Sequence, residues 1–164
     1  MIKKILLAIA IALPTFASAQ KFGTVNTQTL LEAMPETTAA NTQLEAAAKK
    51  YEDEFKKLQD EFQKKYTEFQ QLEETTPQSI KDRRMQELQE QSQRMEQFRS
   101  TAAQDIDRQQ QTLMQPITEK LQKAIQAVGA ANNFTMIFPA GMSLYNGSDV
   151  QDITALVKTE LGIK

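Results

Sequence analysis

Residue types that commonly carry out chemistry are scarce in this sequence. The chain has no histidine and no cysteine, which removes imidazole bases, thiol nucleophiles, disulfides and most zinc sites. Asp105 and Asp107 could suggest a carboxylate pair for acid–base work, but residues two apart on a helix do not face each other. We therefore expect no enzymatic activity, no catalytic or metal-binding residue and no cofactor.

Short nucleotide and glycan motifs add no chemistry. The phosphate-binding motif G-x-x-x-x-G-K-[ST] does not occur in the sequence, so we expect no use of ATP. Residues 133–135 and 146–148 match the N-glycosylation sequon. We interpret them instead as strand and turn residues.

The first nineteen residues have the pattern of a secretory signal peptide. Lys3 and Lys4 precede an apolar run from Ile5 to Leu13, which is too short to span a bilayer as a helix. A small-residue site follows, and we predict cleavage between Ala19 and Gln20. The alternative, an N-terminal core helix, does not explain both flanks of the run. The mature protein is therefore expected to be exported, with no lipid-anchoring cysteine.

Charge argues against nucleic acid as a partner. Without the two lysines of the signal peptide, the chain has 17 basic and 21 acidic residues, a net charge of −4. An acidic, exported protein lacks the basic surface that phosphate backbones require. Basic residues cluster near the predicted tip at Lys81, Arg83 and Arg84, with Asp82, Glu73 and Glu74 among them. This mixture argues against binding to lipopolysaccharide or to an anionic membrane, although it leaves contact with a membrane surface open.

A long helix is predicted from about residue 36 to 74, where the chain contains neither Gly nor Pro. It would extend about 58 Å. Its apolar residues form two heptad series, which are Leu44, Tyr51, Leu58 and Leu72, interrupted at Lys65, and Ala48, Phe55, Phe62 and Phe69. Alternating steps of three and four indicate a seam that packs on a partner helix.

A second helical pattern, from about residue 80 to 130, supplies that partner. Pro77 disfavours helix in the segment between the two patterns. The seam of the second helix runs from Met85 to Val128, and many glutamines interrupt its middle. The sequence thus predicts a helical hairpin with its tip at about residues 75–79.

The two ends of the mature chain carry strand and turn patterns. We predict strands at about 21–26 (KFGTVN) and 133–138 (NFTMIF), and a further strand at 142–145 (MSLY) that forms a hairpin with the second. Ser148 and Gln151 form a capping box. A C-terminal helix is therefore expected at about 149–161.

These elements give an α+β fold that is mostly α. A coiled-coil-like arm, residues 36–111, is predicted to project from a small β-containing body made of residues 20–35 and 112–164. Such a body is too small for a large core of its own. Its short apolar strand edges invite pairing with other copies, so we expect oligomerisation through the body.

The order of these elements, together with YNGSDVQDIT at residues 145–154 and the weaker KFGTVN, resembles the Skp (OmpH-like) family of periplasmic chaperones. The resemblance covers the mature chain in architecture and about thirty residues in motif. It implies a homotrimer whose body is a joint β-core and whose three helical arms enclose unfolded outer-membrane proteins without ATP. The protein would then be a holdase that prevents aggregation of its clients.

Two groups of residues are candidates for contacts in such an assembly. The aromatic stripe of the arm is open to two interpretations, hairpin packing and client contact. The arm candidates for client contact are Phe55, Phe62, Tyr66, Phe69, Met85, Met95 and Phe98. The body candidates for oligomerisation are Phe22, Val25, Phe134, Met136, Phe138, Leu144, Ile117 and Leu121.

A structural role remains as an alternative. The chain could be a coiled-coil envelope protein that bridges folded partners. Such a spacer needs an uninterrupted seam. Lys65 and the glutamines of the second helix interrupt the seam here, and they favour the chaperone.

Overall fold

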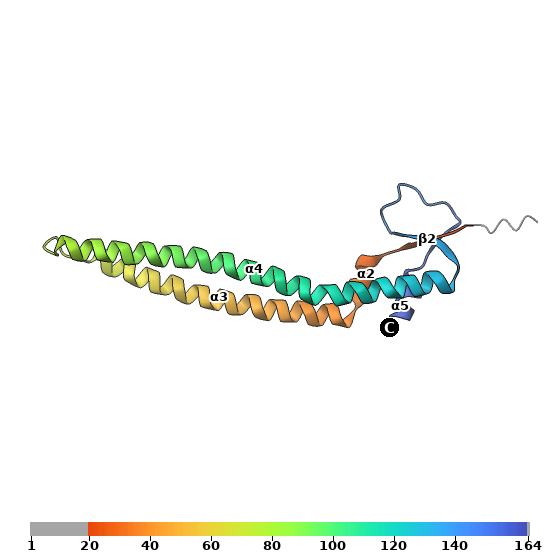
Figure 1. Cartoon of the computed structure of the whole chain (residues 1–164), viewed down its shortest axis with the longest axis horizontal. Helices are drawn as coiled ribbons and strands as arrows, with labels where there is room; N and C mark the ends of the chain where they lie inside the picture. The colour runs from red at the N-terminus through yellow and green to blue at the C-terminus, as the bar shows by residue number, and fades with distance from the viewer. Residues whose placement is uncertain (1–19, 164) are drawn as a thin grey trace, which may run out of the picture. The chain divides into compact units, whose positions relative to one another are not determined.

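The computed structural model describes residues 20–163 (Figure 1), so the predicted signal peptide lies outside the described residues. The fold is α+β and mostly helical, as predicted. In chain order its elements are β1 (Lys21–Val25), α2 (Thr27–Ala33), α3 (Pro35–Gln70), α4 (Gln78–Ala131), β2 (Phe134–Pro139), β3 (Val150–Asp152) and α5 (Thr154–Glu160). Within the described residues, no helix combines the length and the apolar character needed to cross a bilayer.

Helices α3 and α4 form the long antiparallel hairpin (Figure 1). Pro35 occupies the first turn of α3, where its missing N–H costs nothing and its fixed φ suits the helix. Helix α3 ends at Gln70, so the connection is residues 71–77 and begins earlier than the predicted tip at 75–79. Glu73 and Glu74 lie three and four residues beyond this end, and carboxylates are unfavourable near the negative end of a helix.

The sheet corrects the predicted hairpin. Its strand order is β2-β1-β3, and both neighbours run parallel to β1. Residues 142–145 are not a strand in the structure, and β3 takes the place beside β1. Parallel strands need long crossovers. The whole arm serves as the crossover between β1 and β2.

Gly23 explains how closely β2 approaches β1. A Cβ atom at this position would lie 3.1 and 3.2 Å from two ring carbons of Phe134 and 3.4 Å from Cγ1 of Ile137. Only a glycine leaves that space to the two larger side chains. Phe134 in turn lies beneath the ammonium group of Lys21, 4.2 Å from the ring centroid, a cation–π contact.

The C-terminal helix is shorter than predicted. It covers Thr154–Glu160 and not 149–161, because Val150–Asp152 pairs with β1. The capping box at Ser148 does not start it. The N-cap position is Ile153, without a side-chain cap, and Asp152 precedes it: its Oδ1 accepts the backbone N–H of Thr154 at 2.9 Å and the Thr154 hydroxyl at 2.5 Å.

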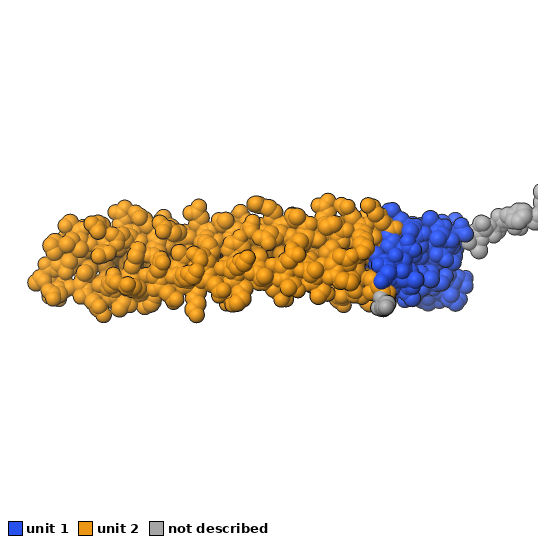
Figure 2. Space-filling model, turned by 90° about the horizontal axis from the view of Figure 1, so that it is seen from below, with its two compact units in different colours: residues 1–27, 124–162, 164 blue, residues 28–123, 163 orange. Residues whose placement is uncertain are grey.

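The described chain divides into two compact units, coloured separately in Figure 2. The first contains the sheet and α5, and its buried apolar residues include Val25, Val128, Ile153 and Val157. The second, residues 28–123, contains the arm, and Leu30, Met34, Ile117 and Leu121 are buried in it. The functional division into body and arm remains a proposal.

Candidate functional site

An aromatic cluster joins the two helices of the arm near its middle. Phe98 of α4 packs edge-on against Tyr51, with ring centroids 6.0 Å apart, and stacks on Phe55 at 6.4 Å. The guanidinium group of Arg99 lies over the ring of Phe55, 5.5 Å from its centroid. The predicted seam is therefore real at this level of the arm. All three aromatic side chains remain partly exposed.

A polar contact crosses the arm beside this cluster. The Tyr51 hydroxyl donates a hydrogen bond to Oδ2 of Asp105 at 2.6 Å, and Nε2 of Gln109 donates to the same oxygen at 2.6 Å. The hydrogen bond from Tyr51 is the main reason that the pKa of Asp105 is lowered. The same bond raises the pKa of the Tyr51 phenol. Asp105 therefore acts as an interhelical acceptor and not as half of a pair with Asp107.

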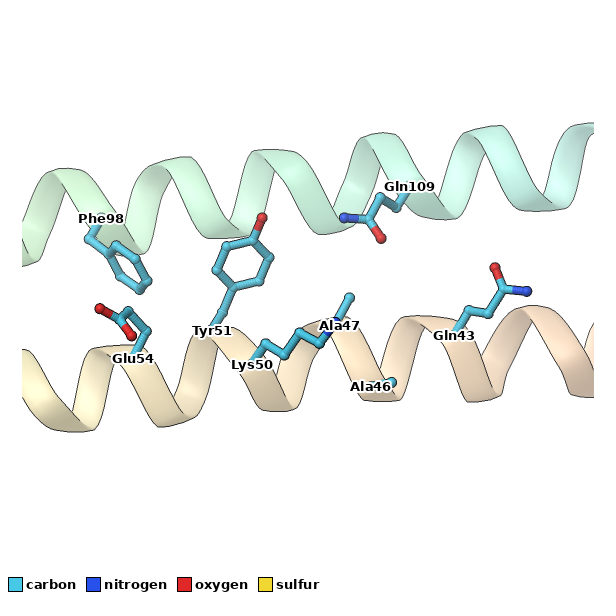
Figure 3. A pocket seen from close by; sticks show the side chains of 8 residues that line it. All are labelled: Gln43, Ala46, Ala47, Lys50, Tyr51, Glu54, Phe98 and Gln109. Atoms are coloured by element: carbon cyan, nitrogen blue, oxygen red, sulfur yellow. The ribbon is translucent and has the colours of Figure 1, made fainter.

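A cleft of about 650 Å³ lies between the helices next to this contact (Figure 3). Tyr51 reaches from α3 toward α4, and Phe98 reaches back from α4 at the same end of the cleft. Ala46 and Ala47 line the α3 side, where small side chains leave the space open. The remaining lining residues are Gln43, Lys50, Glu54 and Gln109.

Beyond the aromatic cluster, toward the tip, the seam is weaker. Phe62 stacks on Tyr66, 6.2 Å away, but both belong to α3. Lys65 occupies a seam position and is exposed. Opposite, Gln91 is only 6% exposed, and its Oε1 has no hydrogen-bond partner. An unsatisfied buried amide destabilises the pairing of the helices at this level.

The arm residues proposed for client contact fall into two groups. Tyr66 and Met85 are exposed, at 41% and 46%. The other five are partly buried: Phe55, Phe62, Phe69, Met95 and Phe98. Ile80 is as exposed as Met85 but was not among the predicted residues. Apolar side chains of the arm thus remain available to other molecules along its length.

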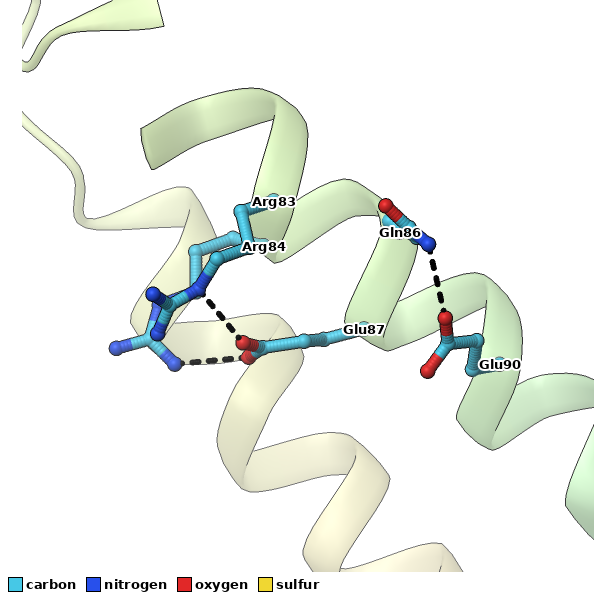
Figure 4. Close-up of polar contacts among 5 residues, drawn as sticks. All are labelled: Arg83, Arg84, Gln86, Glu87 and Glu90. Carbon is cyan, nitrogen blue, oxygen red and sulfur yellow. Dashed lines mark hydrogen bonds and ion pairs between the residues drawn. The ribbon is translucent and has the colours of Figure 1, made fainter. Parts of the chain in front are cut away.

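The basic residues near the tip are already bound to acceptors. Arg83 and Arg84 both pair with the carboxylate of Glu87, at 3.2 and 3.0 Å (Figure 4). The hydrogen bond from Arg84 is the main reason that the pKa of Glu87 is lowered, and the bond from Arg83 lowers it further. Lys81 donates to the backbone carbonyl of Glu74 at 3.0 Å. Arg83 and Arg84 thus share a single carboxylate, and Lys81, bound to a neutral carbonyl, keeps its positive charge.

A second apolar surface belongs to the unit that contains the sheet. A pocket of about 420 Å³ is lined by Phe22, Phe138, Met142, Tyr145 and Val150, with two polar neighbours. Several large apolar side chains of the same unit are exposed: Met136, Phe138, Met142, Leu144 and Tyr145. Leu144 is fully exposed. Exposed apolar side chains around a pocket of this kind are typical of contact sites between proteins.

The body residues proposed for oligomerisation also separate by burial. Val25, Ile117 and Leu121 are buried within a single copy, so their side chains are not available to a neighbour. Phe22 and Phe134 are partly buried. Met136, Phe138 and Leu144 are exposed. Sequence reasoning did not single out Met142 and Tyr145, which border the apolar pocket.

The end of the most specific sequence motif has a structural role. Asp152 binds Thr154, as described above, and the Thr154 hydroxyl accepts the backbone N–H of Asn26 at 2.9 Å. The bonds from Thr154 are the main reason that the pKa of Asp152 is lowered. The motif thereby fixes the end of β1, β3 and the start of α5 to one another. Within the described residues, no group of acidic residues has the arrangement of a metal site.

Comparison with known proteins agrees with this architecture. The sequence matches the family model described as outer membrane protein (OmpH-like) over residues 21–161. A comparison with curated proteins gives no match. The OmpH-like family consists of periplasmic chaperones that bind outer-membrane proteins and is not known for enzymes. Because the match covers most of the sequence, this chain belongs to the OmpH-like family of periplasmic outer-membrane-protein chaperones.

Proposed function

We propose that this chain is an ATP-independent holdase, exported with cleavage after Ala19, that works as a homotrimer. Its arms bind unfolded outer-membrane proteins and prevent their aggregation. The observation that carries the proposal is the accessibility of the arm's apolar residues. Phe55, Phe62 and Phe98 are only partly buried, and Tyr66, Ile80 and Met85 are exposed. A spacer between folded partners would gain stability by burying them.

Holding an unfolded chain requires many weak contacts. Exposed methionine side chains adapt to varied partners because they are flexible, and aromatic rings add large apolar contact areas. Contacts spread over several arms add through effective concentration. A client strand covered in this way cannot pair with another unfolded chain. The carboxylates, lysines and glutamines that surround the apolar residues keep the empty arm soluble.

Self-association is supported by the unit that contains the sheet. Its sheet has three strands, and β2 and β3 are both edges within one copy. Exposed apolar residues, among them Met136, Leu144 and Tyr145, lie on and near this sheet in sequence. Short open edges and exposed apolar side chains favour pairing with further copies. The number three comes from the family resemblance.

Substituting the exposed arm residues tests the proposal. In the triple variant Tyr66→Gln, Ile80→Gln, Met85→Gln, the fold should persist because these side chains are already exposed. We expect weaker prevention of aggregation when an unfolded outer-membrane barrel protein is diluted from urea, measured by light scattering. A matched control replaces exposed Gln63, Gln86 and Gln93 with Ser, and should protect as the wild type does. Equal protection by the two triple variants would contradict a role for the exposed arm residues.

A further inference from the structure

The cleft between α3 and α4 has the features of a binding site within a single arm. Its volume of about 650 Å³ lies in the range of pockets that hold small organic groups. All its lining residues come from the arm, on the helices α3 and α4. One end is an aromatic wall made by Tyr51 and Phe98. The alanines at positions 46 and 47 leave room for a ligand between the helices.

The charges around the cleft favour a neutral ligand. It is lined by one cation, Lys50, and one carboxylate, Glu54, which is paired with Lys57 at 3.1 Å. The nearby carboxylate of Asp105 is bound by Tyr51 and Gln109. The residues that line the cleft therefore carry no net charge, since Lys50 and Glu54 are of opposite sign. Gln43 and Gln109 offer amide groups, which suit the peptide groups next to a bound side chain.

We propose that this cleft binds an aromatic side chain of an unfolded client, and that the bond between Tyr51 and Asp105 positions the aromatic wall that receives it. A ring entering from outside can pack on Tyr51 and Phe98, and aromatic pairs gain stability beyond the area they bury. This inference rests on the proposed holdase function, for which it names a specific subsite and a preferred kind of client residue.

Filling the cleft provides the test. Ala46 lines it, whereas Ala48 is an exposed alanine of the same helix that does not. Ala46→Leu and Ala48→Leu therefore add the same side chain inside and outside the cleft, at exposed positions where helix propensity hardly changes. The probe is N-acetyltryptophanamide, titrated into the mature protein and followed by NMR shifts of the Tyr51 and Phe98 rings.

We expect saturable shifts of both rings in the wild type and in Ala48→Leu, and binding weaker by about tenfold in Ala46→Leu, equivalent to about 1.4 kcal/mol. Unchanged binding in Ala46→Leu, or no saturable shift in the wild type, overturns the inference. Melting temperatures of both variants verify that the arm is folded.

A second measurement separates this inference from the proposed function. Capture of an unfolded barrel protein is compared with capture of the same protein after its aromatic residues are replaced by leucine. We expect Ala46→Leu to lose the wild type's preference for the aromatic client and Ala48→Leu to keep it. If the wild type captures neither client, the holdase proposal fails. If it captures both equally and Ala46→Leu does the same, only the cleft inference fails.

Discussion

Tyr51 on α3 donates a hydrogen bond of 2.6 Å to Asp105 on α4, across 54 residues of sequence. The contact lies at the aromatic end of the interhelical cleft, where Tyr51 also packs against Phe98. Gln109 donates to the same carboxylate oxygen and holds it from within α4. The arm is thus joined here by a polar and an aromatic contact that share one residue.

Removing only the hydroxyl should loosen the arm at this level. In Tyr51→Phe the ring contact with Phe98 persists, but Asp105 loses its partner on α3. We expect a lower melting temperature and faster amide hydrogen exchange in residues 44–58 and 95–109. Tyr66→Phe removes an exposed hydroxyl from the same helix and should change neither. Unaltered exchange in Tyr51→Phe would show that the hydrogen bond does not hold the helices together.

The same contact gives a dependence on pH. The bond from Tyr51 lowers the pKa of Asp105 in the folded protein, so its contribution is present above the ordinary pKa of about 3.9 and is lost as the pH falls through the lowered value. The difference in melting temperature between wild type and Tyr51→Phe should therefore shrink below about pH 3.9. A difference that stays constant or grows on acidification contradicts this linkage.

Gln91 provides a test of the weak seam. Its side chain is buried and its Oε1 has no partner, so Gln91→Leu removes an unsatisfied acceptor. We expect the free energy of unfolding to rise by about 1–2 kcal/mol. Gln93→Leu, at an exposed position of the same helix, should give no comparable gain. A lower stability of Gln91→Leu, measured by urea denaturation, would mean that the amide stabilises the seam.

Gly23 tests the close approach of β1 and β2. Gly23→Ala places a Cβ atom against Phe134 and Ile137, and overpacking of this kind costs about 1–3 kcal/mol. The double variant Gly23→Ala, Phe134→Leu should recover part of the loss. Gly147→Ala is the control, since nothing lies within 4 Å of a Cβ atom there. Equal melting temperatures for Gly23→Ala and the control would contradict the tight contact.

Asp152 tests the structural role of the sequence motif. Asp152→Ala removes the acceptor for the first N–H of α5 and for the Thr154 hydroxyl. We expect a loss of about 1 kcal/mol, the usual net contribution of an intramolecular hydrogen bond. Asp149→Ala, in the loop before β3, should have a smaller effect. Similar melting temperatures of the two variants would show that the hydrogen bonds of Asp152 do not stabilise the start of α5.

The arm could be predicted from sequence because its signal is local and repeated. Heptad spacing of residues such as Tyr51, Phe55 and Leu58 marks a seam wherever the partner helix lies. The register of the seam differs at its start. The heptad series included Ala48, but Ala47 lines the cleft and is partly buried, whereas Ala48 is exposed. The bond from Tyr51 to Asp105 could not be foreseen, because it depends on how two helices align across the hairpin.

The strands and helix of the C-terminal region were harder to predict from sequence, for a physical reason. MSLY has the composition of a strand, but it does not pair in the structure: Val150–Asp152 lies beside β1, and the outer edge of β2 stays open within one copy. The capping-box pattern at Ser148 favours a helix start in this segment, but Val150–Asp152 pairs with β1, more than a hundred residues away in sequence, and the helix begins at Thr154. Local patterns do not contain that information.

The mass of the mature protein in solution, alone and with an unfolded outer-membrane barrel protein, tests the central claim most directly. Light scattering coupled to size exclusion should give three subunits for the free protein, and a single soluble complex of three subunits with the client. A folded monomer at working concentration that still keeps the client soluble would contradict the proposed assembly.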